Sequence, residues 1–92
     1  MEDEASDRVL TYRGFATRKA GDVAGGLAWY RVALAANPDN LRARAYMGQA
    51  LADRGDTVAA RAQLSRTRAR GGRGTWPEIA LRLTLESGGS GY

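Results

Sequence analysis

Apolar residues recur along the chain with the period of an α-helix. Between residues 23 and 36 they occupy an i, i+3, i+4, i+7 stripe, the pattern of an amphipathic helix with one buried face. Asp22 precedes this stripe as a favourable N-cap residue, and Pro38 follows it as a stop signal. Stripes of the same period cover residues 43–51 and 58–64. The pattern therefore predicts an all-α fold.

The sequence repeats itself at an offset of 34 residues. Eight of the 30 residue pairs that align 7–36 with 41–70 are identical, where chance would supply ~3. The identities include two Gly-Asp pairs. Because glycine lets the chain turn sharply and aspartate caps a following helix, each unit predicts two helices joined by a tight turn. Either Asp39 or Asn40 is expected to cap the first helix of the second unit. The identical pairs are Arg8/Arg42, Tyr12/Tyr46, Gly14/Gly48, Ala16/Ala50, Gly21/Gly55, Asp22/Asp56, Ala28/Ala62 and Ala35/Ala69.

A further segment follows the two units. Gly-Gly-Arg-Gly at 71–74 predicts a loop, and residues 75–87 predict a fifth helix in which Thr75 and Glu78 form a capping box. The apolar stripe of this helix is expected to pack on the second hairpin, bury Trp76 and act as a cap. That stripe consists of Trp76, Ile79, Ala80 and Leu83.

The predicted organisation runs from an acidic N-terminal tail to a flexible C-terminal tail. The tail at 1–6 precedes units 7–40 and 41–70, the loop and the capping helix, and the second tail covers 88–92. One core is expected to join the helices, formed by Leu27, Tyr30, Leu34, Met47, Leu51, Leu64, Ile79 and Leu83.

This arrangement resembles tetratricopeptide repeats, helix–turn–helix units with a period of 34. The resemblance covers residues 7–70. It includes small residues at Gly14, Gly48, Gly26 and Ala60, large residues at Tyr30 and Leu64, and Pro38 near the end of the first unit. Arg13, Thr17 and Arg44 depart from it, since they stand where large apolar residues are usual. The whole chain looks similar to small bacterial members of the family. The resemblance implies a right-handed α-solenoid segment of two hairpins.

The resemblance also implies a concave groove for a peptide, lined by the first helix of each unit. Residues 8, 11, 12, 15, 18 and 19 share one helical face, and so do residues 42, 45, 46, 49, 52 and 53. Aromatic rings flanked by arginine suit recognition of a protein. Packing of these rings between adjacent helices is an equally good interpretation. The candidate partner-binding residues are Arg8, Tyr12, Phe15, Arg18, Lys19, Arg42, Tyr46 and Gln49.

Charge is distributed unevenly along the sequence. The formal net charge is +4, but four of the ten acidic residues lie within the first seven positions. The remaining excess of arginine suits an acidic protein segment, and it also permits nucleic-acid binding. The stretch 68–74, Arg-Ala-Arg-Gly-Gly-Arg-Gly, faintly resembles RNA-binding Arg-Gly segments, although a basic helix end with a glycine terminator is the simpler interpretation. The alternative to an interaction module is thus a basic helical nucleic-acid-binding domain.

The residue types present argue against catalysis. Cysteine and histidine are absent, so thiolate and histidine metal sites and histidine-based acid–base chemistry have no residues to carry them. We therefore expect no enzyme activity, cofactor or membrane span. The expected location is the cytoplasm, or the periplasm if a signal segment has been removed. Because so few repeats leave apolar area on the first helix, we also expect a homodimer or a tight hetero-partner contact through the first hairpin, anchored by Tyr12, Phe15 and Trp29.

Overall fold

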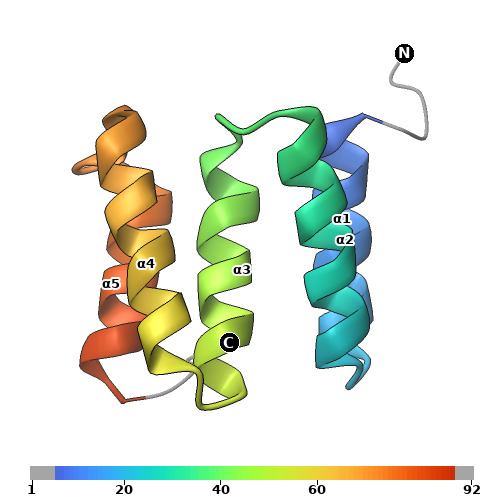
Figure 1. Ribbon diagram of the computed structural model, residues 1–92. Coiled ribbons are helices and arrows are strands. Elements are labelled where there is room, and N and C mark those ends of the chain that lie inside the picture. Colours follow the sequence, from blue (N-terminus) through green and yellow to red (C-terminus); the bar gives the residue numbers. More distant parts are fainter. Residues whose placement is uncertain (1–5, 89–92) are drawn as a thin grey trace.

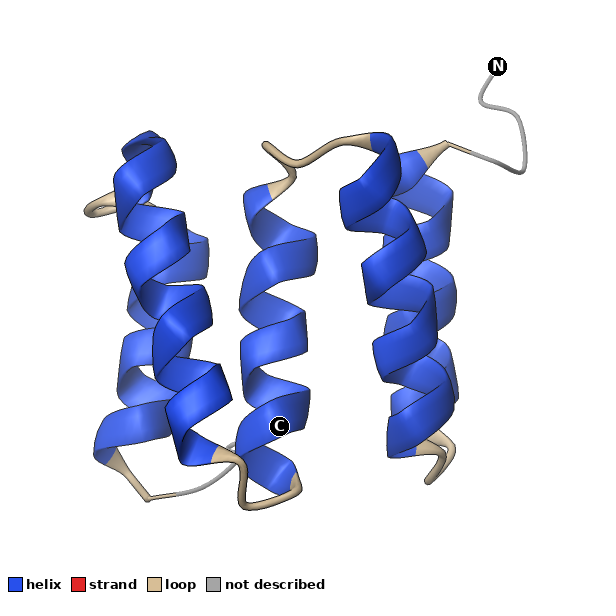
Figure 2. Ribbon diagram, viewed as in Figure 1, coloured by secondary structure: helices blue, strands red, loops and turns tan. Residues whose placement is uncertain are grey.

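The computed structural model describes residues 6–88, which form five α-helices and a short π-helical turn (Figure 1 and Figure 2). No strand occurs in this part of the chain, and the all-α prediction is confirmed. None of the helices found there is both long enough and apolar enough to cross a membrane. The elements are α1 (Asp7–Lys19), α2 (Val23–Ala36), α3 (Leu41–Asp53), α4 (Thr57–Thr67), η1 (Arg68–Gly72) and α5 (Trp76–Glu86).

The helices pack as two consecutive hairpins followed by α5. Helices α1 and α2 form the first hairpin, α3 and α4 form the second, and α2 packs against α3. Helix α5 packs against both α3 and α4. In Figure 1, α2 and α4 lie nearer the viewer than α1 and α5, and α3 lies between the two pairs. This is the arrangement that a stack of helical hairpins requires.

Side-chain caps begin α2, α3 and α4 at the predicted places. The Asp22 carboxylate accepts a hydrogen bond from the Gly25 N–H at 2.8 Å, and Asp56 accepts one from Ala59 at 3.3 Å. Asn40, one of the two candidates, caps α3 by accepting from the Ala43 N–H at 2.9 Å. These bonds satisfy N–H groups that the first turn of a helix leaves unpaired, so they define where each helix begins.

Glycine lies where two helices approach most closely. A Cβ atom at Gly14 would lie 2.6 Å from the Tyr30 ring, and one at Gly26 would lie 2.9 Å from the Arg18 Cβ. Gly26 therefore lies at a close contact between α2 and α1. At Gly48, a Cβ would lie 2.6 Å from a methyl carbon of Leu81. Absence of a side chain is what lets α1 pack on α2 and α3 pack on α5.

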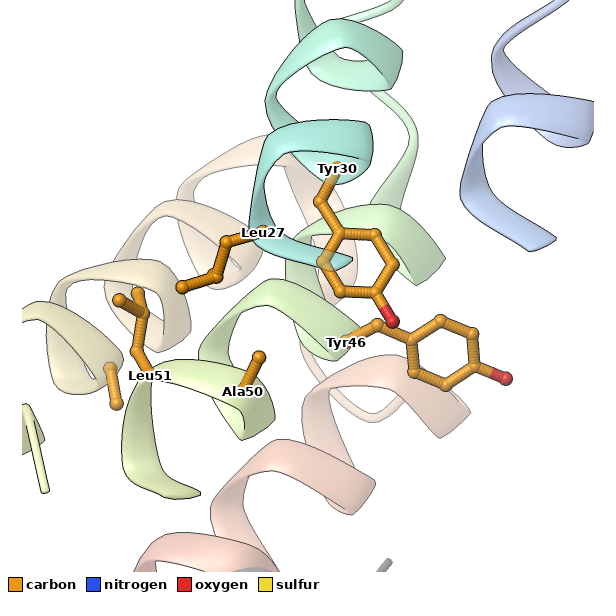
Figure 3. Packing of buried hydrophobic residues seen from close by; sticks show 6 residues of the cluster. Leu27, Tyr30, Tyr46, Ala50 and Leu51 are labelled. Atoms are coloured by element: carbon orange, nitrogen blue, oxygen red, sulfur yellow. The ribbon is translucent and has the colours of Figure 1, made fainter. Parts of the chain in front are cut away.

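The main core cluster lies between the two hairpins. Figure 3 shows Leu27 and Tyr30 of α2 directed toward the side chains of α3, with the rings of Tyr30 and Tyr46 next to each other. Of the eight predicted core residues, Leu27, Tyr30 and Leu51 are buried, and Leu34, Met47, Leu64 and Ile79 are half-buried. Leu83 was predicted wrongly, because 53% of its surface is exposed.

Helix α5 is present, but it packs through a different face from the one predicted. Trp76 is 46% exposed, and the buried residues of α5 are Glu78, Leu81 and Thr84. Burial of Glu78 is possible because its carboxylate pairs with Arg82 at 3.3 Å and with Arg68 at 3.7 Å. Of the predicted stripe, Trp76 and Leu83 are therefore exposed, and Ile79 and Ala80 are only half-buried.

The predicted capping box of α5 is also wrong. The Thr75 side chain makes no capping hydrogen bond to the helix; its hydroxyl instead donates to the Gly72 carbonyl at 2.6 Å. Gly72 belongs to η1, the π-helical turn in which α4 continues, and helical geometry ends at Gly71, whose φ is +84°. Thr75 thus stabilises the turn between α4 and α5, while the carboxylate of Glu78 is engaged by arginine.

Candidate interaction surface

Helices α1, α3 and α5 share one side of the molecule, which we call the inner face. Arg8, Tyr12 and Arg42 of the predicted site line one pocket on this side, Lys19 Nζ lies 5.6 Å from the Phe15 ring centroid, and all four side chains are exposed. Phe15 is half-buried there. The other three predicted residues, Arg18, Tyr46 and Gln49, are 5%, 7% and 1% exposed. The predicted set thus divides into residues that solvent reaches and residues that lie beneath them.

Three aromatic rings cross the inner face from one helix to the next. The Phe15 ring on α1 lies 5.0 Å from that of Tyr46 on α3, measured between centroids. The Tyr46 ring meets the edge of Trp76 on α5 at 6.1 Å and an interplanar angle of 85°. Such tilted and edge-to-face contacts are favourable for aromatic pairs. We call Phe15, Tyr46 and Trp76 the aromatic row; it joins all three helices of this face.

Arg42 lies above the aromatic row and is held from two sides. Its Nη1 donates to the Tyr12 hydroxyl at 2.7 Å, and its guanidinium carbon lies 5.5 Å from the centroid of the Trp76 ring. These contacts orient an exposed cation between α1 and α5. Within residues 6–88, no carboxylate lies within ion-pair distance of Arg42, since the ion pairs found there use other arginines.

Two pockets open on the inner face. One, of about 260 Å³, lies between α1 and α3, and we call it the Arg42 pocket; it is lined by Arg8, Thr11, Tyr12, Asn40 and Arg42. The other, of about 410 Å³, lies between α3 and α5, and we call it the α5 pocket. Its lining includes Gln49, Trp76, Ile79, Ala80, Leu83 and Thr84. The α5 pocket is predominantly apolar, because the apolar stripe of α5 forms most of its wall.

Arg18 and Gln49 tie the helices of the inner face together. Arg18 Nη1 on α1 donates to the Asp53 carboxylate on α3 at 2.7 Å, and the Arg18 side chain is only 2% exposed. Gln49 Nε2 on α3 donates to the Thr84 hydroxyl on α5 at 3.1 Å, and that hydroxyl donates to the Ala80 carbonyl. Arg18 and Gln49 therefore hold the helices of the inner face in position, whereas the side chains of Tyr12 and Arg42 are exposed to solvent on that face.

A buried polar cluster lies under α1. Arg18 Nε and Nη2 and the Tyr30 hydroxyl have no hydrogen-bond partner among the described residues. Burial raises the pKa of the Tyr30 hydroxyl, and the positive charge of Arg18 opposes the shift. Tyr30 therefore stays protonated in the folded chain above the pH at which an exposed tyrosine ionises.

Several arginines outside the inner face bind other parts of the same chain. Arg44, expected where an apolar residue is usual, is buried, and it donates to Gln63 at 3.1 Å and to the Pro38 carbonyl at 2.8 Å. Burial lowers the pKa of its guanidinium, and the charges of Arg70 and Arg66 add to this effect. Arg70 in turn pairs with Asp39 at 2.6 Å. Because these cations have partners within the chain, they do not form an uninterrupted basic surface.

Residues of α5 complete the inner face, and the sequence reasoning did not assign them to it. The signal that could have found them is the 34-residue offset itself, which carries Asp7 to Leu41 and then to Thr75. On this numbering, Trp76 corresponds to Arg42 and Leu83 corresponds to Gln49. Helix α5 thus repeats the position of α1 and α3, and its apolar stripe follows their inner side.

The described residues hold no group of three or more carboxylates that could bind a metal ion. A family model described as tetratricopeptide repeat matches residues 18–80, more than half of the chain. The match begins in the last turn of α1 and ends within α5. The search of curated proteins and the search of solved structures gave no match.

Proposed function

Because the chain belongs to the tetratricopeptide repeat family, we propose that it is a non-catalytic interaction module that binds a segment of a partner protein on its inner face. Repeats of this family generally mediate protein–protein interaction and are typically not catalytic. We further propose that the partner lies on the inner face formed by α1, α3 and α5.

The observation that carries this choice is the exposed surface around Arg42. Tyr12 and Leu83 are 48% and 53% exposed, and Trp76 between them is 46% exposed. Large aromatic and aliphatic side chains next to an oriented arginine are the residue types that dominate binding energy in protein interfaces. Buried ties such as that between Arg18 and Asp53 hold the helices in place, so this surface is preorganised and costs little to order on binding.

Affinity capture with matched variants tests the proposal. One bait carries Tyr12→Ser and Leu83→Ser on the inner face; the control bait carries Val32→Ser and Val58→Ser on α2 and α4. The two valines are 51% and 82% exposed, so both double variants remove apolar groups that solvent already reaches. We expect the wild-type chain and the control bait to capture the same protein, and the inner-face bait to lose it.

Two results would count against the proposal. Equal loss of the captured protein with both baits would show that the contact is not specific to the inner face, and loss with the control bait alone would place it on α2 and α4. Saturable binding that the inner-face variants leave unchanged, measured with the purified partner, would have the same meaning. Circular dichroism of each bait checks that the helices are intact.

A further inference from the structure

Resting on the proposed function, we infer the chemistry of the partner segment: an extended peptide in which an acidic side chain stands two residues from a large apolar side chain. The acidic group binds Arg42, and the apolar group enters the α5 pocket. The two subsites adjoin each other at Trp76, which contacts the arginine on one side and lines the pocket on the other.

The acidic preference follows from the state of Arg42. Its Nη1 donates to the Tyr12 hydroxyl, which leaves the Nε and Nη2 N–H groups for an incoming acceptor. Guanidinium groups match carboxylates in geometry and charge, and such hydrogen bonds are stronger than neutral ones. The carboxylate of Asp7, on the same helix as Arg8 and Tyr12, accepts hydrogen bonds from Asn37 and Asn40. The field at Arg42 is therefore not cancelled by a described ion-pair partner.

The apolar preference follows from the α5 pocket. Its volume of about 410 Å³ exceeds what one aliphatic side chain needs, and Ile79 and Leu83 form its apolar wall beside Trp76. Leu83 is 53% exposed, so a side chain placed there would remove apolar surface from water. Among the described residues, those that line this pocket are all uncharged. An acidic or basic group would lose hydration there without a partner, which directs the carboxylate to Arg42 instead.

The spacing follows from Trp76, which the two subsites share. The guanidinium carbon of Arg42 lies 5.5 Å from the Trp76 ring centroid, and Trp76 also lines the α5 pocket. In an extended peptide, side chains two residues apart share a face and are ~6.6 Å apart along the chain. Adjacent side chains would point to opposite faces. An acid and an apolar residue at i and i+2 can therefore reach both subsites at once.

Selection from a library of random octapeptides, displayed on phage between fixed flanking sequences so that the library adds no free peptide end, tests this inference on the purified full chain. We expect the enriched peptides to share an Asp or Glu two positions from Leu, Ile, Met or Phe. An enriched peptide is then synthesised with blocked ends, together with its Glu→Gln (or Asp→Asn) analogue and an analogue in which serine replaces the apolar residue. Affinities are measured by fluorescence anisotropy for the wild-type chain, Arg42→Gln, Leu83→Ser and the control Arg31→Gln, which removes an exposed charge from α2.

We expect loss of a peptide group to weaken binding strongly only when the residue of the chain that binds that group is intact. Loss of the peptide carboxylate should weaken binding to the wild-type and Arg31→Gln chains about tenfold, which is ~1.4 kcal/mol. The same change should weaken binding to Arg42→Gln less than twofold. Loss of the apolar residue should weaken binding to the wild-type chain to a similar degree, and to Leu83→Ser much less.

Failure of the inference and failure of the proposed function give different results. If selected peptides bind the inner face, as shown by loss of binding with the Tyr12→Ser and Leu83→Ser double variant, but lack the acidic–apolar pair, only the inference is overturned. The inference alone is also overturned if loss of the peptide carboxylate weakens binding to the wild-type chain and to Arg42→Gln by the same factor. If no peptide binds saturably, or if binding is insensitive to the double variant, the proposed function is overturned with it.

Discussion

Two leucines on α5, Leu81 and Leu83, provide a direct test of how this helix packs. Leu81 is fully buried, and its methyl groups lie so close to Gly48 that a Cβ there would be 2.6 and 2.7 Å from them. Leu83, two residues later, is 53% exposed on the opposite face. The same substitution, leucine to alanine, should therefore have very different effects at the two positions.

Replacing Leu81 with alanine should lower the free energy of unfolding by about 2–5 kcal/mol. The cost includes lost burial and a cavity, because the helix backbone at Gly48 cannot move in to fill the space without disturbing α3. A chain of 92 residues has a total stability of ~5–14 kcal/mol, so this loss is a large fraction of it. Replacing Leu83 should cost about 1 kcal/mol or less, since a half-exposed leucine contributes only part of the ~1.5–3 kcal/mol of full burial.

Urea unfolding followed by circular dichroism at equilibrium measures both effects. With a slope of ~1–1.5 kcal/mol per molar urea for a domain of this size, Leu81→Ala should lower the midpoint by about 1.3–5 M. Leu83→Ala should lower it by less than about 1 M. Unchanged slopes show that the comparison concerns stability alone. Equal losses, or a larger loss at Leu83, would refute the packing of α5 through its Leu81 face.

Three further predictions concern other contacts. Gly48→Ala should destabilise the wild-type chain by about 1–3 kcal/mol through overpacking, but less in the Leu81→Ala background; equal costs in urea would mean that the two sites do not touch. Asp53→Asn, which removes the carboxylate from a buried arginine, should cost about 1–3 kcal/mol, against less than about 1 kcal/mol for Asp39→Asn in a surface pair; similar melting temperatures for the two variants would contradict this. Burial raises the pKa of the Tyr30 hydroxyl in the folded state above its unfolded value of 10.0. The contribution of Tyr30 to the free energy of unfolding is therefore complete below pH 10.0 and decreases as the pH rises above that value. Thermal melts between about pH 8 and pH 11 should show a smaller alkaline loss for Tyr30→Phe, and identical losses would refute the assignment.

The sequence by itself determined where α2, α3 and α4 begin and where small residues lie. Asp22, Asn40 and Asp56 cap helices because their side chains bond to N–H groups only three residues away, a local interaction that the surrounding fold does not have to supply. The offset of 34 placed glycine at positions 14 and 48. Both glycines lie at close contacts between helices, Gly14 against Tyr30 of α2 and Gly48 against Leu81 of α5.

The tertiary structure decided which face of α5 is buried, and it also decided which arginine side chains are buried. Helical periodicity favoured the stripe from Trp76 to Leu83, because it carries the larger apolar side chains. The observed face instead places Leu81 against Gly48 and gives the buried Glu78 two arginine partners, one of them supplied by another helix. Arg18 is buried for the same kind of reason, since its partner Asp53 lies 35 residues away in the chain.

The candidate interaction surface depends on both kinds of information. Tyr12 and Arg42 follow from the repeat, because an offset of 34 brings equivalent positions of successive units to the same side. Their hydrogen bond, and the approach of Arg42 to Trp76, exist only once three helices are packed together. The helical period of the sequence distinguishes the faces of a helix by their polarity alone. Which face is buried also depends on the shapes of the side chains and on polar partners that are distant in the sequence. For that reason the apolar stripe of α5, predicted to lie in the core, is on the surface in the folded chain.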